Sequence, residues 1–187
     1  MVEHGLYILR PEFFELIKSL GGDCDSNAGG KRPVYCCIKD NKIDGLYWAI
    51  PTTNISHRSE AQNKKFSYFM SLDDKDLRSC YYHKANTTVK SIYKISSCFP
   101  VIEKYVDHEF TTSGVHVIMR RKNDISEIER KLKRILSFEF RKNNYFPQRI
   151  SDIRNNLIAE IDAACQPKSF EVENPVFSDE ALSTVEV

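Results

Sequence analysis

A polar window directly after Pro51 concentrates side chains that could move a proton or hold an anion. An imidazole exchanges protons near neutral pH, and a guanidinium presents a planar fork of donors to a phosphate. Attack of a ribose 2′-hydroxyl on its neighbouring phosphate needs a base, an acid for the leaving group, and donors that hold the charged phosphorane. The window has candidates for all three roles and no Asp or Glu. We therefore predict four catalytic residues here: Thr52, Thr53, His57 and Arg58.

A second pair, Lys90 and Ser91, stands at the start of a later β-like run. Ser91 could add a hydroxyl to the same catalytic group. Cations bind phosphates and aromatic rings stack on unpaired bases, so we predict six RNA-binding residues: Lys31, Arg32, Lys64, Lys65, Lys90 and Tyr81. The plainer alternatives stay open, namely ordinary loop hydroxyls, an exposed strand lysine and a core aromatic ring.

Other chemistries find little support in the sequence. A magnesium site would need a carboxylate cluster, which the window after Pro51 does not contain. Cys80 and His83 have a ligand-like spacing, but no second pair completes a zinc set. The phosphate-binding glycine loops and the serine-hydrolase and zinc-protease motifs are absent. We expect neither a metal nor a cofactor.

The composition is that of an ordinary soluble protein. The chain has 187 residues, 41% hydrophobic and 28% charged, and no apolar run long enough for a membrane span. Six scattered cysteines without a signal peptide favour reduced thiols and a cytoplasmic location. We expect one domain at residues 1–166 and a flexible acidic tail at 167–187, where too little apolar surface is available to offset the cost of ordering.

The net charge of +1 conceals an uneven distribution. Residues 171–187 hold five acidic residues and no Lys or Arg, so residues 1–170 carry 27 basic and 21 acidic groups. A body with a charge of +6 is compatible with a phosphate-rich partner and also with an ordinary protein surface.

Apolar spacing predicts an α+β fold. The pattern predicts strands at 6–9, 34–38, 46–50, 66–70, 80–82, 89–96 and 115–119, and helices at 11–20, 97–108, 124–142 and from 151 or 152 onward. The runs at 34–38 and 46–50 flank an Asn/Asp/Gly cluster and form a hairpin. The fold class we expect is a small bent antiparallel sheet, like an SH3-type barrel, with added helices.

Three local details sharpen this prediction. Pro51 has no N–H to donate, so strand pairing should stop there. Asp124 and Glu127 have the spacing of a capping box at a helix start. Cys36 and Cys37 would point to opposite faces of a strand, so only one should lie in a core.

The order of these features resembles the ToxN/AbiQ group of toxins, with its relatives CptN and TenpN. The matching segments are a strand with Tyr7, a helix with Phe13 and Leu16, and the stretches at 32–35, 45–53 and 151–157. Thr52 and Thr53 match the family's hydroxyl pair. Ile55 stands where the family often has a lysine, so His57 or Arg58 would take over that role.

The resemblance implies a bent barrel of the MazF/Kid kind and a metal-independent endoribonuclease that leaves a 2′,3′-cyclic phosphate. It also implies a repetitive, pseudoknotted RNA antitoxin, often assembled with the toxin into a closed ring. Our first hypothesis is a toxin of a toxin–antitoxin or phage-defence system that cleaves single-stranded RNA. The alternatives are a non-catalytic module that binds RNA or protein, an interaction protein that works through its acidic tail, and, for the antitoxin, a small acidic protein.

Overall fold

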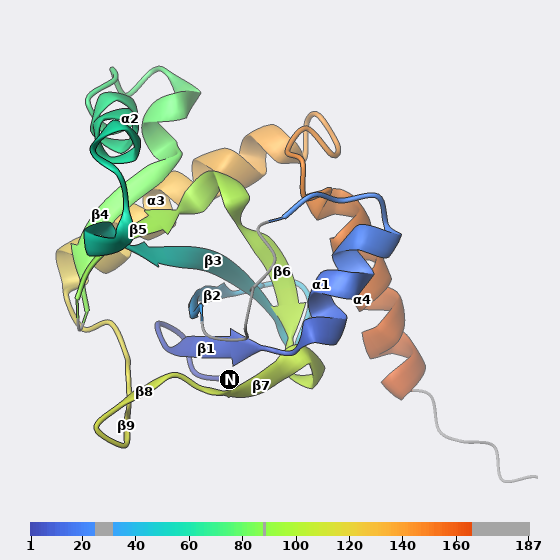
Figure 1. The fold of residues 1–187 in the computed structure, drawn as a ribbon. Helices are drawn as coiled ribbons and strands as arrows, with labels where there is room; N and C mark the ends of the chain where they lie inside the picture. The colour runs from blue at the N-terminus through green and yellow to red at the C-terminus, as the bar shows by residue number, and fades with distance from the viewer. Residues whose placement is uncertain (25–31, 88, 166–187) are drawn as a thin grey trace, which may run out of the picture.

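A seven-stranded antiparallel sheet organises the computed structural model, which describes residues 1–24, 32–87 and 89–165 (Figure 1). The strands pair in the order β4-β5-β3-β2-β1-β7, and β6 also pairs with β3. The sheet strands are β1 (Leu6–Leu9), β2 (Val34–Lys39), β3 (Leu46–Asn54), β4 (Tyr82–Asn86), β5 (Lys90–Lys94), β6 (Phe99–Ile102) and β7 (Val106–Glu109). A separate two-stranded ribbon consists of β8 (Thr111–Thr112) and β9 (Val115–His116).

Four helices and four short 3-10 turns surround the sheet in the described residues. The helices are α1 (Pro11–Ser19), α2 (Glu60–Met70), α3 (Lys122–Glu139) and α4 (Ile150–Cys165). The 3-10 turns are η1 (Ile55–His57), η2 (Leu77–Cys80), η3 (Ile95–Ser97) and η4 (Glu103–Tyr105). The α+β class, with an antiparallel sheet and added helices, is confirmed. The end strands β4 and β7 do not pair, so no closed barrel forms within the described chain.

Helices cover the sheet on both faces. Apolar residues of α3 pack against one face, together with Tyr35 and Trp48. Residues of α1 and α4 pack against the other, together with Val34. Cys36 and Cys37 point to opposite faces, as alternation requires, yet both are buried. The expectation that only one lies in a core was wrong because each face has a core of its own.

Strand β3 joins two parts of the sheet. Its first residues pair with β6 and its last three, Thr52–Asn54, pair with β5, while β2 lies along its other edge. The prediction that Pro51 ends pairing was wrong. The backbone N–H of Thr52 donates to the carbonyl of Pro33, which immediately precedes β2. Because successive residues of a strand direct their backbone nitrogens to opposite edges, the Pro51 nitrogen faces the other edge, between the ends of β6 and β5. No strand there requires a proline amide.

Two predicted elements have the opposite secondary structure. Residues 66–70 belong to helix α2 rather than to a strand, and the segment at 97–108 forms β6, η4 and β7 rather than a helix. Ser59 and Gln62 make a capping box that starts α2, a signal that outweighs the aromatic run after it. In the second segment, Phe99, Val101 and Ile102 are buried in the sheet, and this burial outweighs the helical spacing.

Helix α3 starts two residues before the position predicted for it. Its N-cap is Arg121 and no side chain caps it, so the capping box predicted at Asp124 and Glu127 was wrong. Asp124 instead bonds to His83 across the sheet face. The strand at 6–9, the helix at 11–20, the hairpin and the last helix are confirmed. The predicted tail lies outside the described residues.

Candidate RNA-binding pocket

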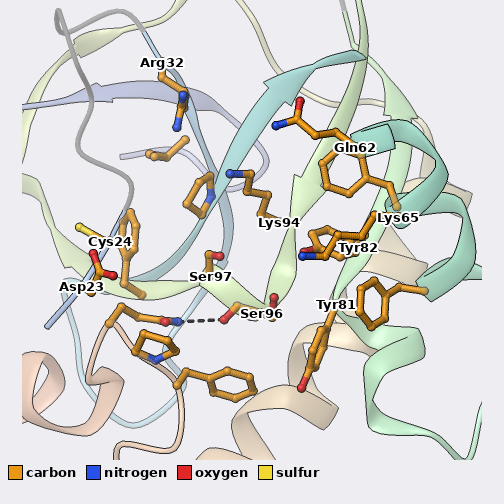
Figure 2. A pocket seen from close by; sticks show the side chains of 18 of the residues that line it. Asp23, Cys24, Arg32, Gln62, Lys65, Tyr81, Tyr82, Lys94, Ser96 and Ser97 are labelled. Atoms are coloured by element: carbon orange, nitrogen blue, oxygen red, sulfur yellow. Dashed lines mark hydrogen bonds between the residues drawn. The ribbon is translucent and has the colours of Figure 1, made fainter. Parts of the chain in front are cut away.

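A pocket of about 650 Å³ opens on the sheet face that also carries α1 and α2. Its walls come from segments far apart in the chain: the end of α1, strands β2 and β3, helix α2, the β4 and β5 strands, and the turn between α3 and α4. Figure 2 shows Arg32, Lys94 and Gln62 at one end, Tyr81 at the other, and Ser96 and Ser97 between them. This volume is typical of sites for small organic ligands and accommodates a nucleotide.

Positive charge dominates the lining. Four cationic side chains, Arg32, Arg58, Lys65 and Lys94, border the pocket, against a single carboxylate, that of Asp23. Each cation comes from a different segment, so no short stretch of sequence contains the set. A concave surface with this excess of positive charge raises the local concentration of anions.

Arg58 is the one predicted catalytic residue that lines the pocket. The Oγ1 of Thr53 accepts two hydrogen bonds from its guanidinium, one from Nε at 2.8 Å and one from Nη2 at 2.6 Å. A guanidinium has five N–H groups, so three remain for a ligand. Both lone pairs of the threonine hydroxyl are occupied, and its proton remains available to be donated. Thr53 thus fixes the orientation of Arg58.

Local capping accounts for other polar residues of the window. The Asn54 side chain accepts a bond from the Ser56 amide at 2.9 Å and starts η1. The Ser59 hydroxyl accepts from the Gln62 amide and starts α2. These caps turn the chain sharply after β3, and Arg58, which lies between them, is carried over the pocket as a result.

Aromatic rings form the rest of the wall. Phe66 and Phe69 of α2 pack around Tyr82, with ring centroids 4.8 and 5.7 Å away, and Tyr81 lies 5.8 Å from Phe69. Burial raises the pKa of Tyr81, and the nearby Tyr145 raises it further. The phenol therefore stays neutral at physiological pH. An aromatic wall beside cations is the combination that binds single-stranded nucleic acids.

The other predicted catalytic residues lie elsewhere. Thr52 and Ser91 belong to the opposite sheet face and are buried, and each donates its hydroxyl proton to a backbone carbonyl, of Pro33 at 2.8 Å and of Val89 at 3.3 Å. His57 is exposed at the end of η1 and does not line the pocket. The structure brings Thr53 and Arg58 together and separates them from Thr52 and Ser91.

Three of the six predicted RNA-binding residues, Arg32, Lys65 and Tyr81, line the pocket. Lys64 points away on α2, paired with Glu60 at 2.8 Å, and Lys90 is exposed outside the lining. Lys31 lies outside the described residues.

Sequence reasoning missed Lys94 and the turn after α3. Lys94 shares a strand face with Lys90 and Ile92, so alternation along β5 could have indicated it. Tyr145 and Gln148 carry no comparable signal, since their place in the wall depends on how the α3–α4 turn folds back.

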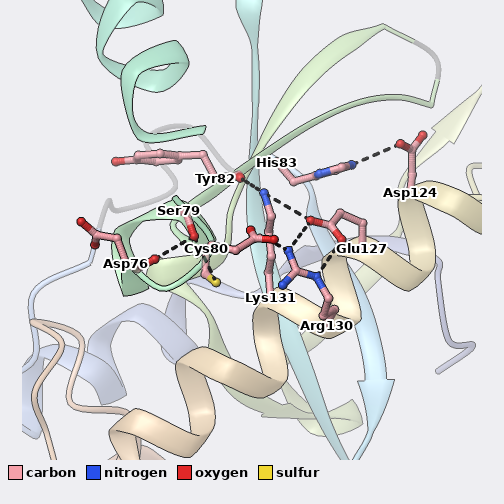
Figure 3. Close-up of polar contacts among 10 residues, drawn as sticks. Asp76, Ser79, Cys80, Tyr82, His83, Asp124, Glu127, Arg130 and Lys131 are labelled. Carbon is pink, nitrogen blue, oxygen red and sulfur yellow. Dashed lines mark hydrogen bonds and ion pairs between the residues drawn. The ribbon is translucent and has the colours of Figure 1, made fainter. Parts of the chain in front are cut away.

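A second polar cluster lies on the α3 face of the same strands (Figure 3). His83 of β4 bonds through Nε2 to Asp124 Oδ1 at 3.1 Å, and Lys131 donates to the Tyr82 carbonyl at 3.0 Å. Burial lowers the pKa of His83, and the bond to Asp124 opposes that shift. The cluster fastens α3 to the sheet and is separate from the pocket.

Two further features bear on the kind of protein. Within residues 1–24, 32–87 and 89–165, no three His, Cys, Asp or Glu side chains gather as metal ligands would. Over the same residues, every helix is too short or too polar to cross a bilayer.

Comparisons with known proteins leave the family unassigned. No family model and no curated protein matches this sequence. One similar solved structure is described as "A processed non-coding RNA regulates a bacterial antiviral system". It aligns over 83% of this chain and 87% of its own, with 12% identity and a TM-score of 0.38. With a TM-score this low, neither activity nor partners follow from the likeness.

Proposed function

We propose that this protein binds single-stranded RNA in the pocket and cleaves it without a metal, by attack of a ribose 2′-hydroxyl on the adjacent phosphate. The observation that carries the proposal is the Arg58 guanidinium, held by two hydrogen bonds to Thr53 and facing a pocket with three more cations. A guanidinium fixed in this way binds a phosphate with little loss of side-chain entropy.

The proposed reaction needs only groups that RNA and this chain supply. The 2′-oxygen forms a bond to phosphorus and the bond from phosphorus to O5′ breaks, which leaves a 2′,3′-cyclic phosphate and a 5′-hydroxyl. Arg58 and Lys94 stabilise the extra negative charge on the phosphorane. The 2′-hydroxyl proton passes to a base and O5′ receives one from an acid; His57, next to Arg58 in the chain, is our candidate for one of these transfers.

The test uses purified full-length protein and a mixed-sequence RNA oligonucleotide in EDTA, with a copy that carries 2′-deoxy sugars at the cleaved position. We expect cleavage of the RNA, a cyclic phosphate at the product end, and no cleavage of the deoxy copy. Cleavage that EDTA abolishes, or that proceeds on the deoxy copy, would exclude this mechanism.

A specific observation supports a second candidate, an RNA-binding module without catalysis. His57, the one imidazole of the predicted catalytic window, is exposed and outside the pocket lining. A binder would retain RNA in the pocket and show no cleavage under any of these conditions. Growth arrest on expression, relieved by Arg58→Ala, would favour the nuclease; normal growth together with RNA binding would favour the module.

The biological role we propose is that of a toxin in a toxin–antitoxin or phage-defence system. This role rests on the resemblance in the sequence and on a pocket suited to RNA. An RNA antitoxin with tandem repeats, which could assemble with the toxin into a ring, would use the same cationic surface as the substrate. Tandem repeats in the DNA just upstream of the gene would support an RNA antitoxin, and a small acidic reading frame there would support a protein one.

A further inference from the structure

The turn between α3 and α4 is held in an unfavourable backbone conformation. Asn144 and Arg149 both have a φ of 58°, in the left-handed region that residues other than glycine rarely adopt. Asparagine adopts this conformation more readily than other non-glycine residues, so the strain lies mainly at Arg149, and it persists only where the surroundings enforce it.

A buried carboxylate enforces the first half of the turn. Glu139 has no solvent exposure and accepts hydrogen bonds from the backbone amides of Asn144 at 2.7 Å, Tyr145 at 3.1 Å and Phe146 at 3.4 Å. Its other contact is the Ser151 hydroxyl, at 2.9 Å. A fully buried glutamate that accepts three backbone amides of one turn and the Ser151 hydroxyl of α4 has a specific positioning task.

Three further hydrogen bonds fix the second half of the turn to the pocket walls. The buried side-chain amide of Gln148 donates to the carbonyls of Ser96 at 2.9 Å and Cys98 at 2.8 Å. The backbone amide of Asp23 donates to the Pro147 carbonyl at 2.9 Å. Gly22 allows this close approach, since a Cβ there would lie 2.7 Å from the Gln148 carbonyl oxygen.

The turn presents an aromatic ring to solvent at the pocket. Tyr145 lines the pocket and is 51% exposed. Edge contacts with Phe138, at 4.7 Å between centroids, and Phe146, at 5.2 Å, hold its ring in place. Tyr81 lies next to this group, 6.1 Å from Phe146. A rigid, half-exposed ring beside an anion site offers a face on which an unpaired base can stack.

We propose that the turn at residues 144–149 is a nucleobase-binding subsite, in which one unpaired base stacks on Tyr145, close to Tyr81, while its phosphate lies toward Arg58 and Lys94. Glu139 is a positioning residue that holds Tyr145 in place. This inference rests on the proposed binding of RNA and adds the part of the pocket that recognises a base.

The direct test is fluorescence anisotropy of a labelled single-stranded RNA with the wild type, Tyr145→Ala, Tyr145→Phe and Tyr68→Ala. Tyr68 is the matched control, a 55% exposed tyrosine on α2 that does not line the pocket. We expect Tyr145→Ala to weaken binding by about 5- to 150-fold, the range measured for loss of one stacked base, and the other two variants to stay within about 2-fold of the wild type.

A second measurement locates the base. In a series of oligonucleotides that each lack one base, we expect the affinity of the wild type to fall when the base at one particular position is missing. This loss of affinity should disappear in Tyr145→Ala. Tyr145→Ala that binds like the wild type, or an abasic penalty that persists in it, would overturn the subsite. Failure of the wild type to bind RNA at all would instead overturn the proposed function.

The role of Glu139 has its own test. Glu139→Gln keeps the shape and removes acceptor capacity, so it should weaken RNA binding while combining non-additively with Tyr145→Ala. The double variant should then bind no more weakly than Tyr145→Ala alone. A fully additive loss would show that Glu139 acts on binding independently of Tyr145 and would overturn its positioning role.

Discussion

The two faces of the β3–β5–β4 corner differ in what they do with polar side chains. On the α3 face, Thr52 is buried and His83 is half-buried, and their side chains bond to the backbone and to α3, respectively. On the α2 face, Thr53 accepts two hydrogen bonds from Arg58, and Arg58 and Lys94 both line an open pocket. Since neighbouring residues of a strand alternate between faces, adjacent threonines have different tasks, one structural and one at the pocket.

The largest expected effect is a loss of stability caused by a substitution in the core of the α3 face. Leu132 of α3 is fully buried in the core of that face. We expect Leu132→Ala to lower the free energy of unfolding by about 2–5 kcal/mol, because it removes apolar contacts and leaves a cavity. Urea denaturation measures this change. Lys65→Ala, at the exposed rim of the pocket, should stay within about 0.5 kcal/mol of the wild type and weaken RNA binding instead. A reversed pattern would contradict the division between faces.

A substitution on the pocket face should weaken RNA binding and cleavage and leave the stability of the fold unchanged. Arg58→Lys keeps the charge but loses the planar fork, so RNA affinity and cleavage rate should fall by about 10- to 100-fold, in keeping with the loss of charge-assisted hydrogen bonds. Anisotropy and single-turnover cleavage measure the two quantities. Lys64→Ala, on α2 and paired with Glu60 outside the pocket, is the control and should change either quantity by less than about 2-fold. Arg58→Lys with wild-type activity would remove Arg58 from the site.

The adjacent threonines allow the sharpest comparison, because the same substitution is made on each face. Thr53→Val should loosen Arg58 and weaken RNA binding by about 3- to 10-fold, with little change in stability. Thr52→Val loses the bond to the Pro33 carbonyl, which should cost about 0.5–1.5 kcal/mol of unfolding free energy and leave RNA binding within about 2-fold. An equal loss of cleavage in both variants would place Thr52 at the site after all.

The smallest expected effect is a pH dependence of protein stability that arises from His83 on the α3 face. Burial lowers the pKa of His83 from 6.5, so folding favours its neutral form. The stability that depends on neutral His83 is fully present above pH 6.5 and is lost as the pH falls toward the lower pKa of the folded state. We expect the melting temperature to fall between about pH 7.5 and 5, and to fall less in His83→Gln, which keeps a polar partner for Asp124. Identical slopes would show that His83 does not contribute.

The sequence supports some parts of the site better than others. Arg58 and Thr53 were predicted from the residue types in one short window, and the two hydrogen bonds between them appear only in the structure. Thr52 and Ser91 are also hydroxyl residues, but their side chains point to the sheet face opposite that of Thr53. Alternation along the strands could therefore have argued against a catalytic role for them. Lys94 lies on the pocket face of β5 and was missed because Val89, Ile92 and Ile95 do not alternate strictly, so the sequence did not fix which side chains share a face.

Local patterns in this chain determined the elements whose stability comes from their own residues. Pro11 starts α1, the Asn/Asp/Gly cluster turns the β2–β3 hairpin, and the apolar stripe of α3 buries Ile128, Leu132 and Ile135. Helix α2, where a strand was predicted, also has a local signal in its Ser59–Gln62 capping box. Tertiary structure decided β6 and β7, where a helix was predicted. It also assembled the pocket, because Arg32, Lys94 and Tyr145 come together only once distant segments pack on one sheet face. Such contacts gain their free energy from burial across the fold, which a short window of sequence does not contain.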